Sequence, residues 1–372
     1  MTIIGIPETR RIQSIQAAAT RMGYVQVQVL SYLELFADAS RLQLCEGWIR
    51  LEPPNECWAT TRLILQAGIA ACQAGNRPYL SLAALETLTY IKGQMLAPWQ
   101  WYHGFCHWLH IFAAETPHLQ WLNHPHHIMI AFDKLQTLIS WDKMSLPTPP
   151  RYPVIRGYDE LRSLIKVRHA RLFLKLRYGY TALGAVALEW HNEKIRALTT
   201  METVETGGQK RLFLNKRVQR LRDESQIAWL VDRLAQEELL VEEWLPKARY
   251  QGKNFDLRVV VFQGRPQHVV GRATAGPFTN LNLDGVRLSR EDVQASLAMI
   301  WGQIEALAGR AADQFPLCKM LGLDILIHAD CQRCFLLEAN ACGDYLPGLL
   351  HKGETTHEME MRELLATHGS HN

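Results

Sequence analysis

Residues 322–348 read GLDILIHADCQRCFLLEANACGDYLPG, and this stretch determines how the rest of the chain is interpreted. Two mainly apolar runs, 323–327 and 334–337, flank the polar segment 328–333. Apolar runs of this length on either side of a short polar segment are typical of a β-hairpin. We therefore predict two antiparallel strands joined by a turn.

Polar side chains occupy positions where a plain core hairpin would carry apolar ones, namely Asp324, Glu338 and Asn340. Glu338 and Asn340 lie two residues apart and share one face of their strand. Asp324 joins that face if it pairs opposite Glu338 or Asn340, but not opposite Ala339, and this requires an odd loop or a β-bulge. Two carboxylates and an amide oxygen form an all-oxygen site suited to Mg²⁺. The alternative is an ordinary hairpin with polar residues at its solvent-exposed ends.

The composition indicates a globular protein of several domains. A chain of 372 residues is long enough for about two or three domains. Hydrophobic residues make up 48% and charged residues 21%, and the net charge of +3 is too small to indicate nucleic-acid binding. No run of about 18 apolar residues and no signal-peptide pattern is visible, so we expect a cytoplasmic protein without a membrane span.

The eight cysteines are scattered along the chain, which is typical of reduced thiols rather than of a disulfide framework. Cys331 and Cys334 form a single CxxC pair in the turn of the predicted hairpin. Zinc would need two further ligands, for which His328 and Cys342 are the nearest candidates. We favour an ordinary turn over a metal or redox role.

The first part of the chain has the pattern of a parallel α/β sheet. A strand at residues 3–6, a helix at residues 10–22 and a strand at residues 24–30 form a β-α-β unit. The loop after the first strand lacks the GxGxxG spacing of a dinucleotide site. Residues 98–127 are rich in tryptophan and histidine. For residues 98–121 we favour packing over an aqueous aromatic interface, a substrate wall or a metal site, and for His124, His126 and His127 we favour an exposed or pocket-lining position over a set of metal ligands.

Two later segments carry groups suited to a nucleotide. The apolar strand 171–175 ends in Lys175, and the following loop contains Gly179 and Gly184 before a new strand begins. Backbone N–H groups of such a flap can hold phosphate oxygens while the lysine adds a point charge. Residues 239–245 read LLVEEWL, in which a carboxylate or carbonyl can accept hydrogen bonds from adenine or ribose while Trp244 packs against them. A further hairpin at residues 256–272 has Asp256, Arg258 and Arg272 near its ends.

The order of these pieces resembles the ATP-grasp superfamily, in particular its glutathione-synthetase-like and ribosomal-protein glutamate ligase branch. The resemblance covers about residues 123–350 and rests on short motifs in the right order. The motifs are Asp133-Lys134, Lys175 with the flap 178–184, Glu242 to Leu245, Asp256-Leu-Arg258, Arg272 with Thr279-Asn280-Leu281, Gly322-Leu-Asp324 and Glu338-Ala-Asn340. The chain is also similar to an uncharacterised bacterial ATP-grasp subfamily in KLRYGYTALGAVALE, EEWLPKARYQGKNFDLRVVV and EANACGDYLPG. The flap RYGYTALGA is poorer in glycine than is usual in this branch.

The resemblance implies an α/β protein in which two α+β subdomains clasp ATP behind a Rossmann-like pre-ATP-grasp domain. Residues 1–122 would form the pre-ATP-grasp domain, and residues 123–235 the region that includes the small lid subdomain. Residues 236–372 would form the large subdomain with the metal hairpin.

The resemblance also implies roles for individual residues. Lys134 and Lys175 would contact the phosphates of ATP, over which the flap with Tyr178, Gly179 and Gly184 would close. The slot for adenine and ribose would be lined by Glu242, Glu243, Trp244 and Leu245, with Asp256 beside the nucleotide. One or two Mg²⁺ ions would be held by Asp324, Glu338 and Asn340. The reacting acyl phosphate would face Arg272, Asn280 and Arg258.

The implied activity is that of an ADP-forming ligase, which phosphorylates a carboxylate and lets an amine or thiol displace the phosphate. Its partners would be small-molecule or peptide carboxylates and amines, without nucleic acid or membrane, in a possible homo-oligomer. Two alternatives stay open. One is a small-molecule kinase on the same fold, and the other is a nucleotide-binding interaction protein without turnover.

Overall fold

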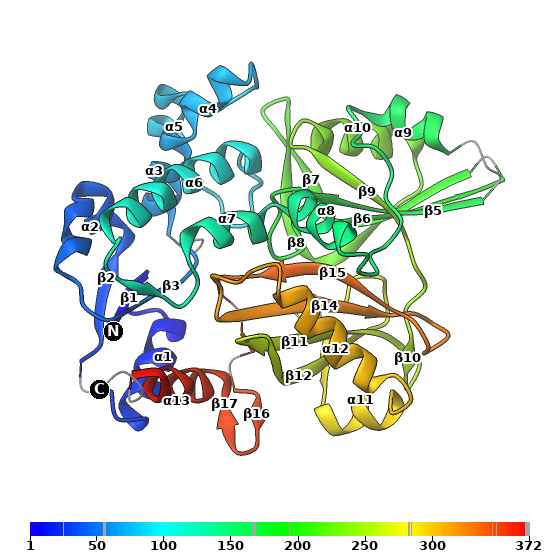
Figure 1. Ribbon diagram of the computed structural model, residues 1–372. Helices are drawn as coiled ribbons and strands as arrows, with labels where there is room; N and C mark the ends of the chain where they lie inside the picture. Colours follow the sequence, from blue (N-terminus) through cyan, green and yellow to red (C-terminus); the bar gives the residue numbers. More distant parts are fainter. Residues whose placement is uncertain are drawn as a thin grey trace.

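The computed structural model describes residues 1–24, 26–54, 57–165, 169–192, 194–281, 283, 285–343, 345–346 and 348–368. Three main sheets follow one another along the chain, with four, five and six strands (Figure 1). Among the residues described, no helix has both the length and the apolar character needed to cross a membrane.

The first sheet is parallel, as its β-α-β pattern predicts, and has the strand order β2-β1-β3-β4. Its strands are β1 (Thr2–Gly5), β2 (Gln28–Ser31), β3 (Trp48–Leu51) and β4 (Gln120–Trp121). Helix α1 (Arg10–Arg21) connects β1 to β2, and the side chain of Thr9 caps it by accepting a hydrogen bond from the backbone N–H of Ile12. The second strand is shorter than predicted and begins at Gln28.

The helices of this first domain pack closely because glycines stand where they cross. They are α2 (Tyr32–Ala37), the 3-10 helix η1 (Ala39–Leu44), α3 (Trp58–Ala67), α4 (Ile69–Ala74), α5 (Leu82–Thr87) and α6 (Pro98–Glu115). A Cβ atom at Gly68 would lie 2.0 Å from the carbonyl oxygen of Gln100, and one at Gly104 would lie 1.8 Å from that of Ile64. Gly68 also separates α3 from α4.

The second sheet is antiparallel and has the order β8-β7-β6-β5-β9. Its strands are β5 (His169–Leu176), β6 (Val186–His191), β7 (Lys194–Thr206), β8 (Gln209–Leu221) and β9 (Leu239–Glu243). The helices of this region are α7 (Pro125–Phe132), α8 (Lys134–Lys143), α9 (Tyr158–Leu164) and α10 (Glu224–Ala235). Strand β9 lies beyond residue 235, where the sequence analysis places a domain boundary.

The edge strand β8 is covered in part by the first domain. The backbone N–H of Met95 donates to the carbonyl of Leu212 at 2.9 Å, and that of Leu214 donates to the carbonyl of Gly93 at 2.8 Å. An uncovered edge strand is a template for pairing with other chains, so this short segment protects it.

The third sheet carries the predicted hairpin. Its main order is β13-β12-β11-β14-β15, with β10 paired to β11. The strands are β10 (Arg249–Tyr250), β11 (Lys253–Phe262), β12 (Arg265–Thr274), β13 (Val286–Leu288), β14 (Met320–Ile327) and β15 (Cys334–Asn340), and α11 (Arg290–Ser296) and α12 (Trp301–Ala312) lie in the connection between β13 and β14. Residues Phe255 to Phe262 of β11 are all buried, which makes this strand the centre of the sheet.

The C-terminal segment returns to the first domain. After the short strands β16 (Leu350–His351) and β17 (Glu354–Thr355), helix α13 (Thr356–His368) lies beside α1, as the red and blue ribbons show (Figure 1). Met361 of α13 is fully buried in one cluster with Ile3, Ile12 and Ile15. The chain therefore uses its last helix to complete the layer that covers the first sheet.

A buried ion pair joins α13 to β3. Arg50 is 1% exposed and donates hydrogen bonds to Glu360 of α13 and, at 2.9 Å, to Glu52. A guanidinium group buried to this extent is stable only when carboxylates compensate its charge.

Replacing Glu360 with glutamine is expected to lower the free energy of unfolding by about 3 kcal/mol, because part of the buried Arg50 charge loses its compensation. The matched control is Glu363→Gln on the same helix, whose partner Arg362 is exposed, and it should change stability by no more than about 0.5 kcal/mol. Urea unfolding followed by circular dichroism measures both. Equal effects of the two substitutions would contradict the assignment.

Candidate active site

A β-bulge brings the three polar residues of the hairpin to one face. Asp324 pairs opposite Glu338, and Gly322 pairs opposite Asn340. The next pair is Ile325 with Leu336, so Leu337 is the extra residue of β15. The bulge that the sequence analysis required as one of two possibilities is therefore present. Asp324, Glu338 and Asn340 lie on the same side of the sheet because paired residues and residues two apart share a face.

Two lysines from other elements reach this hairpin. Lys175 at the end of β5 donates a hydrogen bond from Nζ to the carbonyl oxygen of Leu337, at 3.1 Å, and forms an ion pair with Glu242 at 2.7 Å. Lys134 begins α8, and its Nζ lies 3.5 Å from Oε2 of Glu338. The bulge thus supplies a carbonyl that one lysine uses, and the facing carboxylate attracts the other.

Two arginines approach Asp324 from the neighbouring strands. Nε of Arg258 on β11 lies 2.5 Å from Oδ1, and Nη2 of Arg272 on β12 lies 3.0 Å from Oδ2. Burial raises the pKa of Asp324 to about 6, helped by Glu338 and Asp256 and opposed by the two arginines. Burial also acts to raise the pKa of Glu338, but Lys134, a hydrogen bond with Asp324 and Arg258 outweigh it and lower that pKa.

The donor set fits a hard divalent cation. Two carboxylates face each other across one register position, where a cation between them would relieve their mutual repulsion. The amide nitrogen of Asn340 donates to the carbonyl of Gly322 at 3.3 Å, so its oxygen is the atom that can act as a ligand. No three His, Cys, Asp or Glu side chains in the described part of the chain gather to hold a metal. An ion here would therefore need the amide oxygen and oxygens of a bound ligand.

Asp256 holds Arg272 and Lys247 beside Asp324 and Glu338. It is buried on β11 opposite Arg272, whose Nε donates to Oδ1 at 2.8 Å, while Nζ of Lys247 lies 3.1 Å from Oδ2. The hydroxyl of Thr279 also donates to Oδ2. Burial acts to raise the pKa of Asp256, but Arg272 and Lys247 outweigh it, so the pKa is lowered. Arg272 thereby bridges Asp256 and Asp324, and Asn280 follows directly after Thr279.

The predicted adenine and ribose segment borders an open space. Trp244 lines a cavity of about 500 Å³ together with Arg171, Lys247 and Asn254 among others. The guanidinium of Arg171 lies over the indole ring of Trp244, with 4.0 Å between its central carbon and the ring centroid. Glu243 is exposed, whereas Glu242 and Leu245 are buried and Glu242 is turned to Lys175. Glu242 therefore acts on the position of a lysine.

An aromatic pair that the sequence analysis missed lies on the Lys175 face of β5. Phe173 stands two residues before Lys175, so the two side chains point to the same side. The ring of Phe278 lies 5.7 Å from that of Phe173 and packs with Ala185 and Ala187 of the same sheet. Alternation in the stretch FLK was a signal for Phe173. Phe278 gave none, because it arrives from a loop more than a hundred residues later.

The flap glycines are required by close packing. A Cβ atom at Gly184, where φ is +73°, would lie 2.6 Å from Cγ of Leu176, and one at Gly179 would lie 3.0 Å from the carbonyl of Leu183. Tyr178 is buried, and its ring faces helix α6.

The aromatic and histidine-rich stretch is largely core. Trp101, Tyr102 and Phe105 of α6 are buried in the main hydrophobic cluster, which confirms the interpretation as packing for these residues, while His107 and His110 are exposed. Cys331, with φ of +53°, lies in the turn of the hairpin, where its N–H donates to the carbonyl of His328 at 2.9 Å.

The lowered pKa of Asp256 predicts how stability depends on pH. Asp256→Asn should destabilise the protein by about 3 kcal/mol at neutral pH, because Arg272 and Lys247 lose a buried partner. A carboxylate with a depressed folded pKa stabilises fully above its unfolded pKa of about 3.9, and its contribution is lost as pH falls through the folded pKa. The difference in the free energy of unfolding between the wild type and Asp256→Asn should therefore stay constant between about pH 7 and 5 and become smaller below about pH 4.

Urea unfolding across this pH range measures that difference, with the exposed Asp159→Asn as the control. A difference that does not narrow at acidic pH would show that Asp256 carries no charge in the folded protein.

No protein-family model matches the chain, and no curated protein matches it by sequence. Solved structures, in contrast, match the chain by their fold. The ATP-grasp ligase PsnB complexed with a minimal precursor is 14% identical, with 98% of each chain covered and a TM-score of 0.55. The D-cycloserine synthetase DcsG is 13% identical over 99% of each chain, with a TM-score of 0.54. The macrocyclase MdnC bound with precursor peptide MdnA, from Microcystis aeruginosa MRC, is 11% identical over 99% of this chain and 100% of its own, with a TM-score of 0.54. At such identities the similarity concerns the fold, and the chain has the fold of the ATP-grasp ligases, as the order of its motifs predicts.

Proposed function

We propose that the protein is an Mg²⁺- and ATP-dependent ligase that joins a carboxylate to an amine or thiol through an acyl phosphate and releases ADP. The observation that carries this proposal is the convergence of cations on the hairpin face of Asp324 and Glu338. Arg258, Arg272 and Lys134 come from three different elements to this one face. Phosphoryl transfer needs this combination of metal ligands and positive charges, because negative charge spreads over several oxygens during the reaction.

Each charged group has a place in this proposal. Mg²⁺ held by Asp324, Glu338 and Asn340 would neutralise phosphate charge and orient the γ-phosphoryl group. Lys134 and Lys175 bind phosphate oxygens from the side of the flap. Arg258 and Arg272 act on the acyl phosphate, with Asn280 near it, and Asp256 keeps Arg272 in place. Removing one such charge contact from a transition state costs about 3 kcal/mol, or about a hundredfold in rate.

The adenine and ribose would occupy the cavity at Trp244, with Glu243 and Leu245 beside it. A volume of about 500 Å³ lies within the usual range for a small-molecule site. Phe173 and Phe278 offer aromatic faces on the same side of β5 as Lys175, and flat rings pack well against a purine. The division of the chain at residues 122 and 235 is part of this proposal, with β9 serving as the strand that joins the two clasping sheets.

The solved structures indicate the classes of substrate to test. PsnB is complexed with a precursor and MdnC with a precursor peptide, whereas DcsG is a synthetase of a small molecule. We therefore propose a peptide or small-molecule carboxylate as the acceptor of the phosphoryl group and an amine as the preferred nucleophile.

Thermal unfolding tests the metal hairpin directly. A ligand at about a hundred times its dissociation constant stabilises the folded state by about 2.7 kcal/mol. Mg²⁺ and ATP together should raise the melting temperature of the wild type, whereas ATP with a chelator should not. Glu338→Gln should lose the shift, and the control Glu305→Gln, at a half-buried residue paired with Arg290, should keep it. A shift of equal size in Glu338→Gln would rule the hairpin out as the metal site.

Trapping of the acyl phosphate tests the reaction. ADP release with Mg²⁺ and ATP should depend on a carboxylate, and hydroxylamine should replace the amine and yield a hydroxamate. We would screen amino acids and short peptides with acidic side chains. A stable phosphorylated product without hydroxamate would instead identify a kinase.

A further inference from the structure

The flap, residues 178–184, rests on the N-terminal end of helix α6. The ring of Tyr178 stacks on that of Tyr102, with centroids 4.0 Å apart and planes 16° apart. Both side chains are buried, with 3% of Tyr178 and 7% of Tyr102 exposed. The ring of Tyr180 lies 6.0 Å from that of Trp101. A segment that is expected to close over phosphates is thus in contact with the first domain of the chain.

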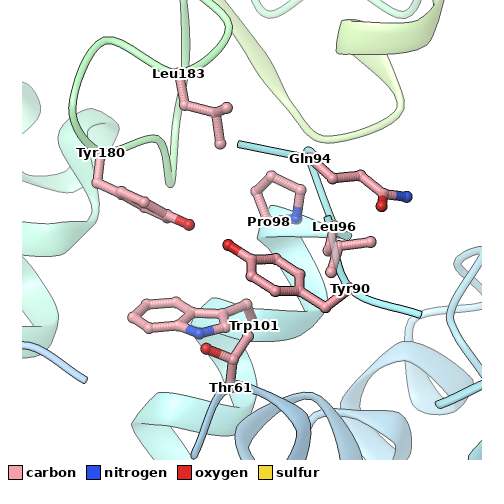
Figure 2. Close-up of a pocket in the computed structure, with 8 residues that line it drawn as sticks. All are labelled: Thr61, Tyr90, Gln94, Leu96, Pro98, Trp101, Tyr180 and Leu183. Carbon is pink, nitrogen blue, oxygen red and sulfur yellow. The ribbon is translucent and has the colours of Figure 1, made fainter. Parts of the chain in front are cut away.

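Figure 2 shows the part of this contact that lies around Tyr180 and Trp101. Tyr180 and Leu183 of the flap face Tyr90, Pro98 and Trp101 of the first domain around a small cavity. Its volume of about 20 Å³ is room for about one water molecule and not for a ligand. The side chains of Tyr90, Pro98 and Trp101 therefore form a packing surface for the flap, which we call its seat.

The backbone of the flap needs such a seat. Thr181 and Ala182 have φ of +53° and +64°, in the left-handed region that is unfavourable for residues with a Cβ atom. Two consecutive residues in this conformation persist only when their surroundings hold them. The root of the flap is fixed by Arg177, which forms ion pairs with Asp133 at 2.5 Å and Glu238 at 2.7 Å. Beyond this root, the hydroxyl of Thr200 donates to the carbonyl of Ala182 at 2.6 Å, Leu183 is buried in the core of the second sheet, and the stack on α6 holds the flap from the side of the first domain.

The position of the flap is linked to a proposed phosphate ligand. Nζ of Lys134 donates a hydrogen bond to the carbonyl oxygen of Gly179, at 2.5 Å, and lies 3.5 Å from Glu338. Gly179 follows Tyr178 directly. A displacement of Tyr178 from its seat therefore moves the carbonyl that holds Lys134.

We propose that Tyr102 is a positioning residue of the ligase: by stacking on Tyr178 it seats the flap on α6 and so places Gly179 and Lys134 for the phosphates of ATP. The role of Lys134 toward ATP rests on the proposed function. The seating of the flap does not, because it is a property of the free protein. The first domain thereby takes part in nucleotide binding without touching the nucleotide.

Hydrogen exchange in the protein without nucleotide tests the seat. The N–H groups of Gly179, Leu183 and Ala185 bond within the flap, to the carbonyls of Leu176, Tyr180 and Ala182. Because the aromatic stack stabilises the flap on α6, its loss in Tyr102→Leu should make hydrogen exchange at these amides about threefold to tenfold faster. Tyr102→Phe keeps the ring and should stay within twofold of the wild type. The amide of Leu174 in β5 is the internal reference.

Trp108→Leu is the matched control. Trp108 is also on α6 but stacks on Phe36, with ring centroids 4.3 Å apart, on the side of the helix away from the flap. It should leave flap exchange unchanged. Equal acceleration in Trp108→Leu and Tyr102→Leu, or none in either, would overturn the proposal. Tyr102→Leu should also add no further acceleration to Tyr178→Leu, because the two substitutions remove the same contact.

Steady-state kinetics with Mg²⁺ and ATP test whether the position of the flap affects nucleotide binding. Tyr102→Leu should raise KM for ATP by about the factor seen in exchange while changing kcat by less than twofold, and Trp108→Leu should change neither. A fall of kcat with unchanged KM would overturn the positioning role. Absence of turnover in the wild type would refute the proposed function instead, and the exchange experiment would still decide whether the flap is seated by Tyr102.

Discussion

Charge compensation at the buried end of the hairpin is the constraint on which the site depends. Asp256 and Asp324 are both almost fully buried, and burial of a carboxylate is unfavourable unless cations and hydrogen bonds compensate it. Their partners, Arg258, Arg272 and Lys247, come from β11, from β12 and from the linker after β9. These elements must therefore take their relative positions before the carboxylates can be buried. The same constraint places the cations where a polyphosphate would need them.

The ion pairs that compensate these carboxylates are of a kind that bound ligands can replace. Lys134 holds Glu338 and the flap carbonyl, and both contacts are of a kind that a phosphate oxygen can substitute. Burial raises the pKa of Asp324, whereas Lys134 and its other partners outweigh burial and lower the pKa of Glu338, and a cation between the two carboxylates would favour the charged form of both. A metal ion would add positive charge between the two carboxylates, and a triphosphate would replace carboxylates as the partner of the surrounding cations. Internal ion pairs thus keep the site in shape until both components arrive.

Local patterns in the sequence predicted the hairpin, the parallel first sheet and the need for either an odd loop or a bulge, because these follow from alternation and spacing over a few residues. The bulge could not be assigned to Leu337, whose carbonyl accepts a hydrogen bond from Lys175 of another sheet, because such a contact is not visible in local spacing. Phe278 and the pairing of Arg50 with Glu360 were invisible for the same reason, because their partners lie far away along the chain. The residue types gave a hypothesis for the chemistry of the site, whereas the contacts that hold these residues come from long-range packing.

Two unusual features of the sequence explain each other in the structure. The flap has few glycines, and Thr181 and Ala182 occupy left-handed conformations that glycine would adopt without strain. Helix α6 is rich in aromatic residues at the end that meets this flap. A glycine-rich flap is mobile and needs no support, whereas a strained one needs a surface that holds it. We interpret the aromatic end of α6 as that surface, which would make the first domain a structural part of the proposed nucleotide site.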